Sequence, residues 1–195
     1  MVGVAERRLE TFPPASCVCG TTKVDSLCGL EGINVAVILT KEARDLGLSE
    51  DVVRTQVERR LEQDGIPVVS TEEYTKAPIV SKTIHDFVAG GYAAMEAGKH
   101  PQKTTDYGRL QVEVAAVGTE YPLAGTVRVT LCQTALLPAT LPDQVMVVPC
   151  ITWLDGSSGI YSTDSFAERI SKSIEKLAGG FCGDYVAAHR KGRGQ

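Results

Sequence analysis

Apolar residues recur at helical spacing in the last part of the chain, from Asp164 to Ala187. Steps of three and four residues place six large side chains on one stripe: Phe166, Ile170, Ile174, Leu177, Phe181 and Tyr185. Burying this stripe contributes on the order of 10 kcal/mol, at roughly 1.5–3 kcal/mol for each side chain. A domain with a net stability of only about 5–15 kcal/mol cannot leave it in water. We therefore expect a helix over 164–187 that packs on an apolar surface.

A second helix is expected over 49–64. Its apolar residues step by four along one face, at Val53, Val57 and Leu61. Ser49 stands where a side chain can cap the first turn, and Gly65 is a typical C-terminal stop. Strands are expected on both sides of this helix, at 33–39 and from 66 to 69. Such a β-α-β unit favours parallel pairing of its two strands.

Clean alternation of apolar and polar residues predicts strands at 110–114 and 126–131, with a third within 145–153 where Pro149 suggests a bulge or an edge. The polar positions of the first two strands would share one face of the sheet: Gln111, Glu113, Thr126, Arg128 and Thr130. The Gly156–Gly159 run is expected to turn the chain into the last helix. Ser165 and Glu168 have capping-box spacing there, with Asp164 as the alternative cap.

These elements predict an α+β fold of the order β-α-β-(inserted helix)-β-β-β-α. One mixed sheet of about five strands would carry the helices 49–64 and 164–187 on one face. We expect a single domain over 31–189, with an insertion at about 71–108 that holds a helix within 81–97. An irregular arm over 1–30 would precede the domain, and a basic tail over 190–195 would follow it.

The net charge of −4 over 195 residues argues against a dedicated nucleic-acid binder, which needs clustered lysines and arginines. No apolar run approaches the roughly 18–20 residues of a membrane helix, so no integral membrane segment is expected. The first fifteen residues lack an apolar segment, and we expect no secretory signal peptide there.

Six cysteines are present. Cys17, Cys19 and Cys28 would hold zinc only with a fourth ligand from elsewhere, and Cys-x-Cys is not the common two-residue-gap spacing. Incidental or disulfide-forming thiols are the commoner interpretation, and no cofactor is expected. The other three lie in expected strands or in the last helix, where a cysteine is usually a small buried hydrophobe: Cys132, Cys150 and Cys182.

The insertion holds three candidate binding residues, Tyr92, His85 and His100. His85 precedes Asp86, but adjacent helical residues point about 100° apart and form no ready acid–base pair. A solvated polar face is the commoner role for them, and a metal or acid–base role would need a second carboxylate brought in by folding.

Two further binding candidates lie on the expected sheet. Trp153, the only tryptophan, would be a good binding anchor if partly exposed, although core or rim packing is commoner. Arg128 lies on the polar face. The Gly156–Gly159 run before a helix could hold an anion on its backbone N–H groups, but a plain connection is the commoner interpretation. It is no phosphate loop, because no Lys-Ser/Thr follows.

Three runs resemble a family of uncharacterised, usually exported bacterial proteins: 29–35 (GLEGINV), 46–49 (LGLS) and 61–68 (LEQDGIPV). Thr152-Trp153 and the final Phe181-x-x-x-Tyr185 resemble the same family, and the resemblance covers about 29–70 and 109–189. The order of elements is more distantly similar to the amino-terminal domain of TolB, to CsgG-like domains and to lipoprotein synthase-activator domains. The family resemblance implies a place in the bacterial envelope or periplasm if the native start lies upstream of Met1. The extra sequence at about 71–108 departs from these relatives.

The sequence carries many folding signals and no convergent set of reactive groups. The leading hypothesis is a non-catalytic module for protein binding or envelope assembly, which acts on another protein through the polar sheet face, the insertion or both. Self-association as a homodimer is a further hypothesis. The alternative is an enzyme of unrecognised type whose site lies between the insertion and the sheet, with His85, Asp86 and His100 as its candidate residues.

Overall fold

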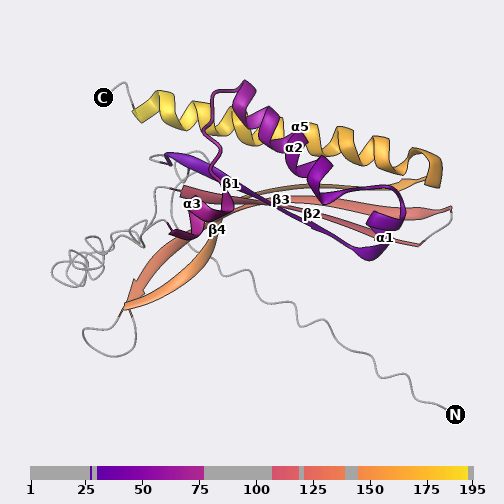
Figure 1. The fold of residues 1–195 in the computed structure, drawn as a ribbon, viewed down its shortest axis with the longest axis horizontal. Coiled ribbons are helices and arrows are strands. Elements are labelled where there is room, and N and C mark those ends of the chain that lie inside the picture. The colour runs from indigo at the N-terminus through magenta and orange to yellow at the C-terminus, as the bar shows by residue number, and fades with distance from the viewer. Residues whose placement is uncertain (1–26, 28–29, 77–106, 119–120, 139–144, 193–195) are drawn as a thin grey trace, which may run out of the picture.

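The computed structural model describes residue 27 and residues 30–76, 107–118, 121–138 and 145–192; for 134–138, 145–150 and 191–192 it describes the backbone alone. Within these ranges one sheet has the order β1-β2-β3-β4 (Figure 1). Its strands are β1 (Gly32–Leu39), β2 (Tyr107–Val117), β3 (Leu123–Pro138) and β4 (Val145–Tyr161). The sheet is mixed, because β1 pairs parallel with β2 and the other two pairs are antiparallel.

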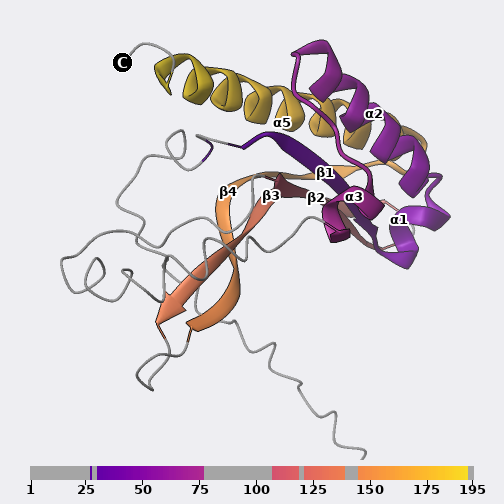
Figure 2. The same ribbon diagram turned by 60° about the vertical axis from the view of Figure 1, so that its left-hand side comes forward.

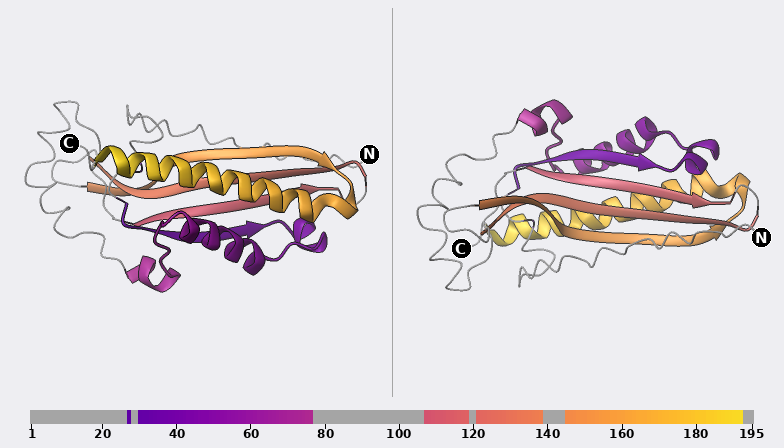
Figure 3. Two further views of the ribbon diagram at one scale, coloured as in Figure 1. Left: turned by 90° about the horizontal axis from the view of Figure 1, so that it is seen from above. Right: turned by 90° about the horizontal axis from the view of Figure 1, so that it is seen from below.

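The two long helices, α2 (Glu50–Gln63) and α5 (Thr163–Gly192), lie side by side on the same face of the sheet (Figure 2). Figure 3 shows α5 running lengthwise along the strands, and from below the strands lie in front of both helices. We call this lower side the open face. Two short helices, α1 (Lys41–Asp45) and α3 (Thr71–Lys76), lie near the β1 edge. The expected α+β fold, with both main helices on one face, is therefore confirmed.

The stripe along α5 forms the centre of the core. All six side chains predicted to be buried are buried: Phe166, Ile170, Ile174, Leu177, Phe181 and Tyr185. They face the inward residues of the sheet, which alternate along β2 and β3 as the sequence pattern requires: Leu110, Val112, Val114, Val127, Val129 and Leu131. The apolar stripe of α5 thus packs against the apolar face of β2 and β3.

Helix α2 ends as its sequence predicts. Gly65 has φ of 73°, and its N–H donates to the Glu62 carbonyl at 3.0 Å, while Ile66 N–H donates to the Leu61 carbonyl at 2.9 Å. These two bonds form a Schellman motif, which favours glycine because its conformation is left-handed. Ser49 occupies the N-cap position, but its side chain makes no capping hydrogen bond.

The expected strand at 66–69 is not a strand of the sheet. It contributes one isolated parallel bridge, between Ile33 and Val68. Ile33 N–H donates to the Pro67 carbonyl at 2.9 Å, and Val69 N–H donates to the Ile33 carbonyl at 3.0 Å. After Val69 the chain enters α3, so pairing stops there and the described sheet has four strands instead of five.

The Gly156–Gly159 run is not a turn, because it lies inside β4 and pairs with β3. Gly159 stands opposite Gly125, and the Tyr161 ring lies over this pair. A Cβ at Gly125 would come within 2.9 Å of the Tyr161 ring and 2.8 Å of the Phe166 ring. The two rings meet edge to face at 5.7 Å. The glycines therefore make room for aromatic side chains, as in sheets where a ring covers a glycine.

The expected capping box of the last helix is also wrong. Helix α5 begins at Thr163, and the Ser162 hydroxyl lies 2.8 Å from that of Ser165. Glu168 instead accepts from Lys172 at 2.6 Å, one turn further along. This pair lowers the pKa of Glu168.

The expected helix within 81–97 and most of the expected arm lie outside the described residues. Of the arm, Leu27 and Leu30 are described, and both are buried in the core. The first residues of the expected insertion form α3.

Candidate functional site

Strand register defines the composition of the open face. One row runs across all four strands as Ile38, Glu113, Arg128 and Gly156. The next rows toward the end of β2 are Ala115, Thr126 and Ser158, and then Val117, Ala124 and Ile160. The five polar residues expected to share one face do so, because their positions alternate with the buried residues of β2 and β3.

A charged pair stands at the middle of this face. Arg128 Nη1 lies 3.4 Å from Glu113 Oε2, and Gln111 Nε2 donates to Glu113 Oε1 at 2.5 Å. The Arg128 side chain remains 57% exposed. A guanidinium has five N–H donors, so one long contact with Glu113 leaves most of them available to a ligand or partner. The pair therefore presents both a positive and a negative group.

Next to Arg128 the face is hollowed. The hollow measures about 420 Å³ and is lined on the open face by Thr126, Arg128, Leu154, Gly156 and Ser158. It exists because Gly156, directly opposite Arg128, has no side chain to fill the space. The Gly156 N–H donates to the Asp155 side chain at 2.8 Å.

Exposed aliphatic side chains surround the charged pair and the hollow: Ile38 (49% exposed), Leu154 (47%), Ile151 (58%), Ile160 (61%) and Val117 (71%). Single exposed aliphatic residues are common, but a group of them on one face is typical of a contact surface. The sequence suggested the polar residues of this surface. It did not suggest the aliphatic ones, because they sit in strands whose inward side is apolar as well.

The other end of the open face is more enclosed. Thr130 is buried and Cys132 is half-buried, and this burial raises the pKa of the Cys132 thiol. The Arg109 guanidinium lies 5.9 Å from the centre of the Tyr74 ring on α3. Asn34 ties α3 to β1, because its Nδ2 donates to the Val69 carbonyl at 3.2 Å and lies 3.4 Å from Thr71 Oγ1.

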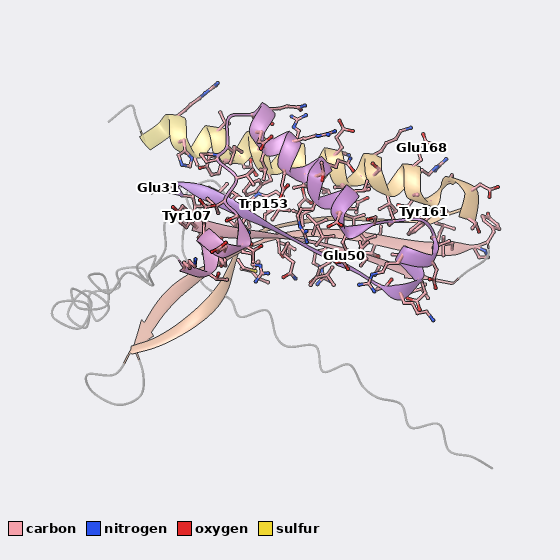
Figure 4. The ribbon with its side chains drawn as sticks, viewed as in Figure 1. Glu31, Glu50, Tyr107, Trp153, Tyr161 and Glu168 are labelled. Atoms are coloured by element: carbon pink, nitrogen blue, oxygen red, sulfur yellow. The ribbon has the colours of Figure 1, made fainter. Side chains whose placement is uncertain are left out.

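The structure assigns Trp153 to the core. Its side chain is 2% exposed, and its indole N–H donates to Asp184 of α5 at 2.9 Å. Figure 4 shows it between the sheet and α5, where its ring meets Phe181 edge to face at 5.3 Å. A partly exposed binding anchor is therefore excluded, and core packing is the role observed. Its place on the helix-covered side follows from pairing with Leu131.

Other candidates cannot be placed. Tyr92, His85, His100, Cys17, Cys19 and Cys28 lie outside the described residues, together with the helix that was expected to carry the first two. The candidate anion loop, Gly156–Gly159, is not at the start of a helix, because it pairs with β3 inside β4 and the residues 160–162 separate it from α5. The anion-binding interpretation is wrong for that reason.

A second hollow, of about 500 Å³, lies where the end of α5 meets the start of β1. The Leu30 carbonyl there accepts from the Tyr185 hydroxyl at 2.6 Å and lies 3.0 Å from His189 Nε2. The Tyr185 and His189 rings stack at 4.1 Å, and burial raises the pKa of Tyr185. Sequence analysis missed His189, although it follows Tyr185 by four residues and so continues the buried side of the helix. These contacts hold α5 to the sheet.

Cys182 is buried beside α2. Burial, followed by the hydrogen bond and charge of Asp64, raises the pKa of its thiol from 9.0 to about 12. A thiol with this pKa stays protonated near neutral pH, and the thiolate is the reactive form. Within the described ranges, no group of three histidine, cysteine, aspartate or glutamate side chains could hold a metal ion. Nor is any helix in those ranges both long and apolar enough to cross a lipid bilayer.

No protein-family profile matches the chain, and no curated protein sequence matches it. Among solved structures, a hypothetical protein from Chlamydia trachomatis is similar with a TM-score of 0.31 and 11% identity, over 78% of this chain and 98% of that one. A similarity this low carries no argument about fold or function. The comparisons therefore lend no support to the expected exported family or to the TolB and CsgG likeness.

Proposed function

We propose that this protein is a non-catalytic binding module that assembles with another protein chain through the open face of its sheet. One observation carries the proposal. Exposed aliphatic side chains, a half-exposed charged pair and a hollow occur together on the open face, around the row that contains Glu113 and Arg128. Protein contact surfaces commonly combine apolar contacts with a small number of arginines, and arginine is enriched among the residues that contribute most of the binding energy.

Helices cover the opposite side of the sheet, which supports this choice of surface. There α2 and α5 bury the inward residues, so the side chains of that face serve the core. The open face offers the hollow beside Arg128 and exposed aliphatic side chains that a partner would remove from water. Removing apolar area from water contributes about 25 cal/mol per Å² before the costs of association.

Site-specific photo-crosslinking in the native host tests the proposal. A photoreactive amino acid at Ser158, on the open face, should give a discrete protein adduct. The same amino acid at Thr55, an exposed position on α2, should give none. Arg128→Glu should abolish the Ser158 adduct, because it reverses the charge beside the hollow and places two acidic groups side by side.

The control is the melting temperature of each variant, which should stay within a few degrees of the parent since all three positions are exposed. Equal adducts from both positions, or a Ser158 adduct that survives the Arg128 substitution, would rule out the open face as the binding surface.

A further inference from the structure

We propose that the partner on the open face is a second copy of this chain, packed face to face about a two-fold axis parallel to the strands. This inference rests on the proposed function, because it names the partner of that same surface. The inference rests on the row Ile38, Glu113, Arg128 and Gly156. When a second copy of this row faces it in reverse order, each residue meets one that complements it in charge or size.

The symmetry follows from the strand order. An axis between the two sheets, above the boundary of β2 and β3, places β1 of one copy against β4 of the other and β2 against β3. Positions along the strands are unchanged by this rotation, so each row faces the same row in reverse order. Two sheets that pack face to face keep their strands roughly aligned, as in β-sandwiches. The proposed contact is confined to the rows from Glu113 to Val117, because the far ends of β3 and β4 bend toward the open side (Figure 1).

Charge is the first complementary feature. Glu113 of one copy faces Arg128 of the second, and Arg128 faces Glu113 of the second. Within each copy the two side chains already pair at 3.4 Å, with Arg128 57% exposed. The four side chains of the dimer therefore form a square in which each charge has two neighbours of opposite sign. A like-signed face would repel its own copy, and this one does not; such charge patterns set specificity and register more than affinity.

Shape is the second complementary feature. Ile38, which is 49% exposed, faces Gly156 of the second copy, where the hollow of about 420 Å³ lies. Two rows on, Val117, 71% exposed, faces Ala124 of the second copy. A large side chain thus meets a small one at both positions, and small-to-large matching is what close packing between two sheet faces requires.

The size of the surface sets the expected affinity. The surface has one row on four strands and two rows on three strands, which makes ten positions. With rows about 7 Å apart and strands about 4.8 Å apart, they cover on the order of 300 Å² per copy. A standard stable interface buries about 800 Å² per partner. We therefore expect a weak dimer in exchange with its monomer, at concentrations of micromolar or above.

Sedimentation velocity over a concentration series, with charge-reversal variants, tests the inference. The wild-type chain should sediment increasingly as a dimer as its concentration rises. Glu113→Arg alone and Arg128→Glu alone should each weaken dimerisation by roughly tenfold or more, since each gives a face of one sign. An equimolar mixture of the two variants should dimerise again, because an all-positive face then meets an all-negative one.

The mixture separates contact between copies from damage within one copy. Both variants lose the pair inside the chain, so only a contact between chains can restore assembly on mixing. Ile38→Ala should weaken the dimer as well, whereas Val52→Ala, at an aliphatic position on α2 that is even more exposed, should not. Circular dichroism of each variant confirms that it is folded.

Failure of this inference and failure of the proposed function give different results. A monomeric wild type, or a dimer that ignores both charge reversals, overturns the second copy as partner. If the Ser158 crosslink then joins a different protein and still depends on Arg128, the proposed function stands. If neither a dimer nor a specific crosslink is found, both are overturned.

Discussion

At the scale of single residues, burial decides what a reactive group can do. Cys182 follows Phe181 on α5 and lies against α2, so its thiol is removed from water and faces the Asp64 carboxylate. Both effects disfavour the thiolate. A raised pKa of about 12 means that the protonated form prevails at every lower pH, with about a thousandfold less thiolate than at the ordinary value of 9.0.

We therefore expect Cys182 to resist alkylation by iodoacetamide in the folded protein near neutral pH and to react readily once denaturant is added. Peptide mapping by mass spectrometry gives the rate for this cysteine separately from the others. Rapid labelling of Cys182 under native conditions would contradict both its burial and its raised pKa.

At the scale of elements, β4 shows how a neighbour can reverse a local signal. Gly156–Gly159 contains the residues of a flexible turn, yet the segment pairs with β3 through Thr126 and Val127, and Gly159 lies under the Tyr161 ring. The ring needs the space that Gly125 and Gly159 leave. The local sequence cannot reveal this, because Gly125 lies more than thirty residues upstream.

Gly125→Ala should destabilise the protein by about 1–3 kcal/mol, because the added methyl group overlaps two aromatic rings. The matched control is Gly180→Ala on α5, where a Cβ meets none of the described atoms within 4 Å. That change should stabilise by roughly 0.5–1 kcal/mol, as alanine favours a helix over glycine. Urea unfolding measures both, and equal effects of the two changes would contradict the assigned role of Gly125.

At the scale of the whole molecule, α5 and the sheet behave as one unit. Trp153 on β4 contacts Phe181 and donates to Asp184, while Tyr185 and His189 reach the Leu30 carbonyl at the start of β1. Contacts from one helix thus extend to both edges of the sheet. A cooperative transition is the expected behaviour of a domain with a single such core.

Since Trp153 is the only tryptophan and lies under α5, its fluorescence reports the docking of that helix. We expect its red shift on denaturation to coincide with the loss of far-ultraviolet circular dichroism, at one midpoint. A fluorescence change at clearly lower denaturant would show that α5 leaves the sheet first, against the expectation of one unit.

The sequence by itself determined the elements whose hydrophobic period is long and regular. The six-residue stripe of α5, the four-residue steps of α2 with its glycine stop, and the alternation in β2 and β3 each follow from local geometry, which fixes the spacing of side chains on one face. Arg128 was placed on the correct side of the sheet for the same reason.

Only the tertiary structure decided what depends on contacts between distant segments. Gly156–Gly159 is part of a strand because it pairs with β3. The 66–69 segment forms only one bridge because the chain enters α3 directly afterwards. Trp153 is in the core because it packs under α5. The open-face row likewise exists only because β1, β2, β3 and β4 align in one register. Local sequence sets the spacing of apolar residues within a helix or strand. Which strands pair, in which register, and which side chains a helix covers are set by segments far away along the chain.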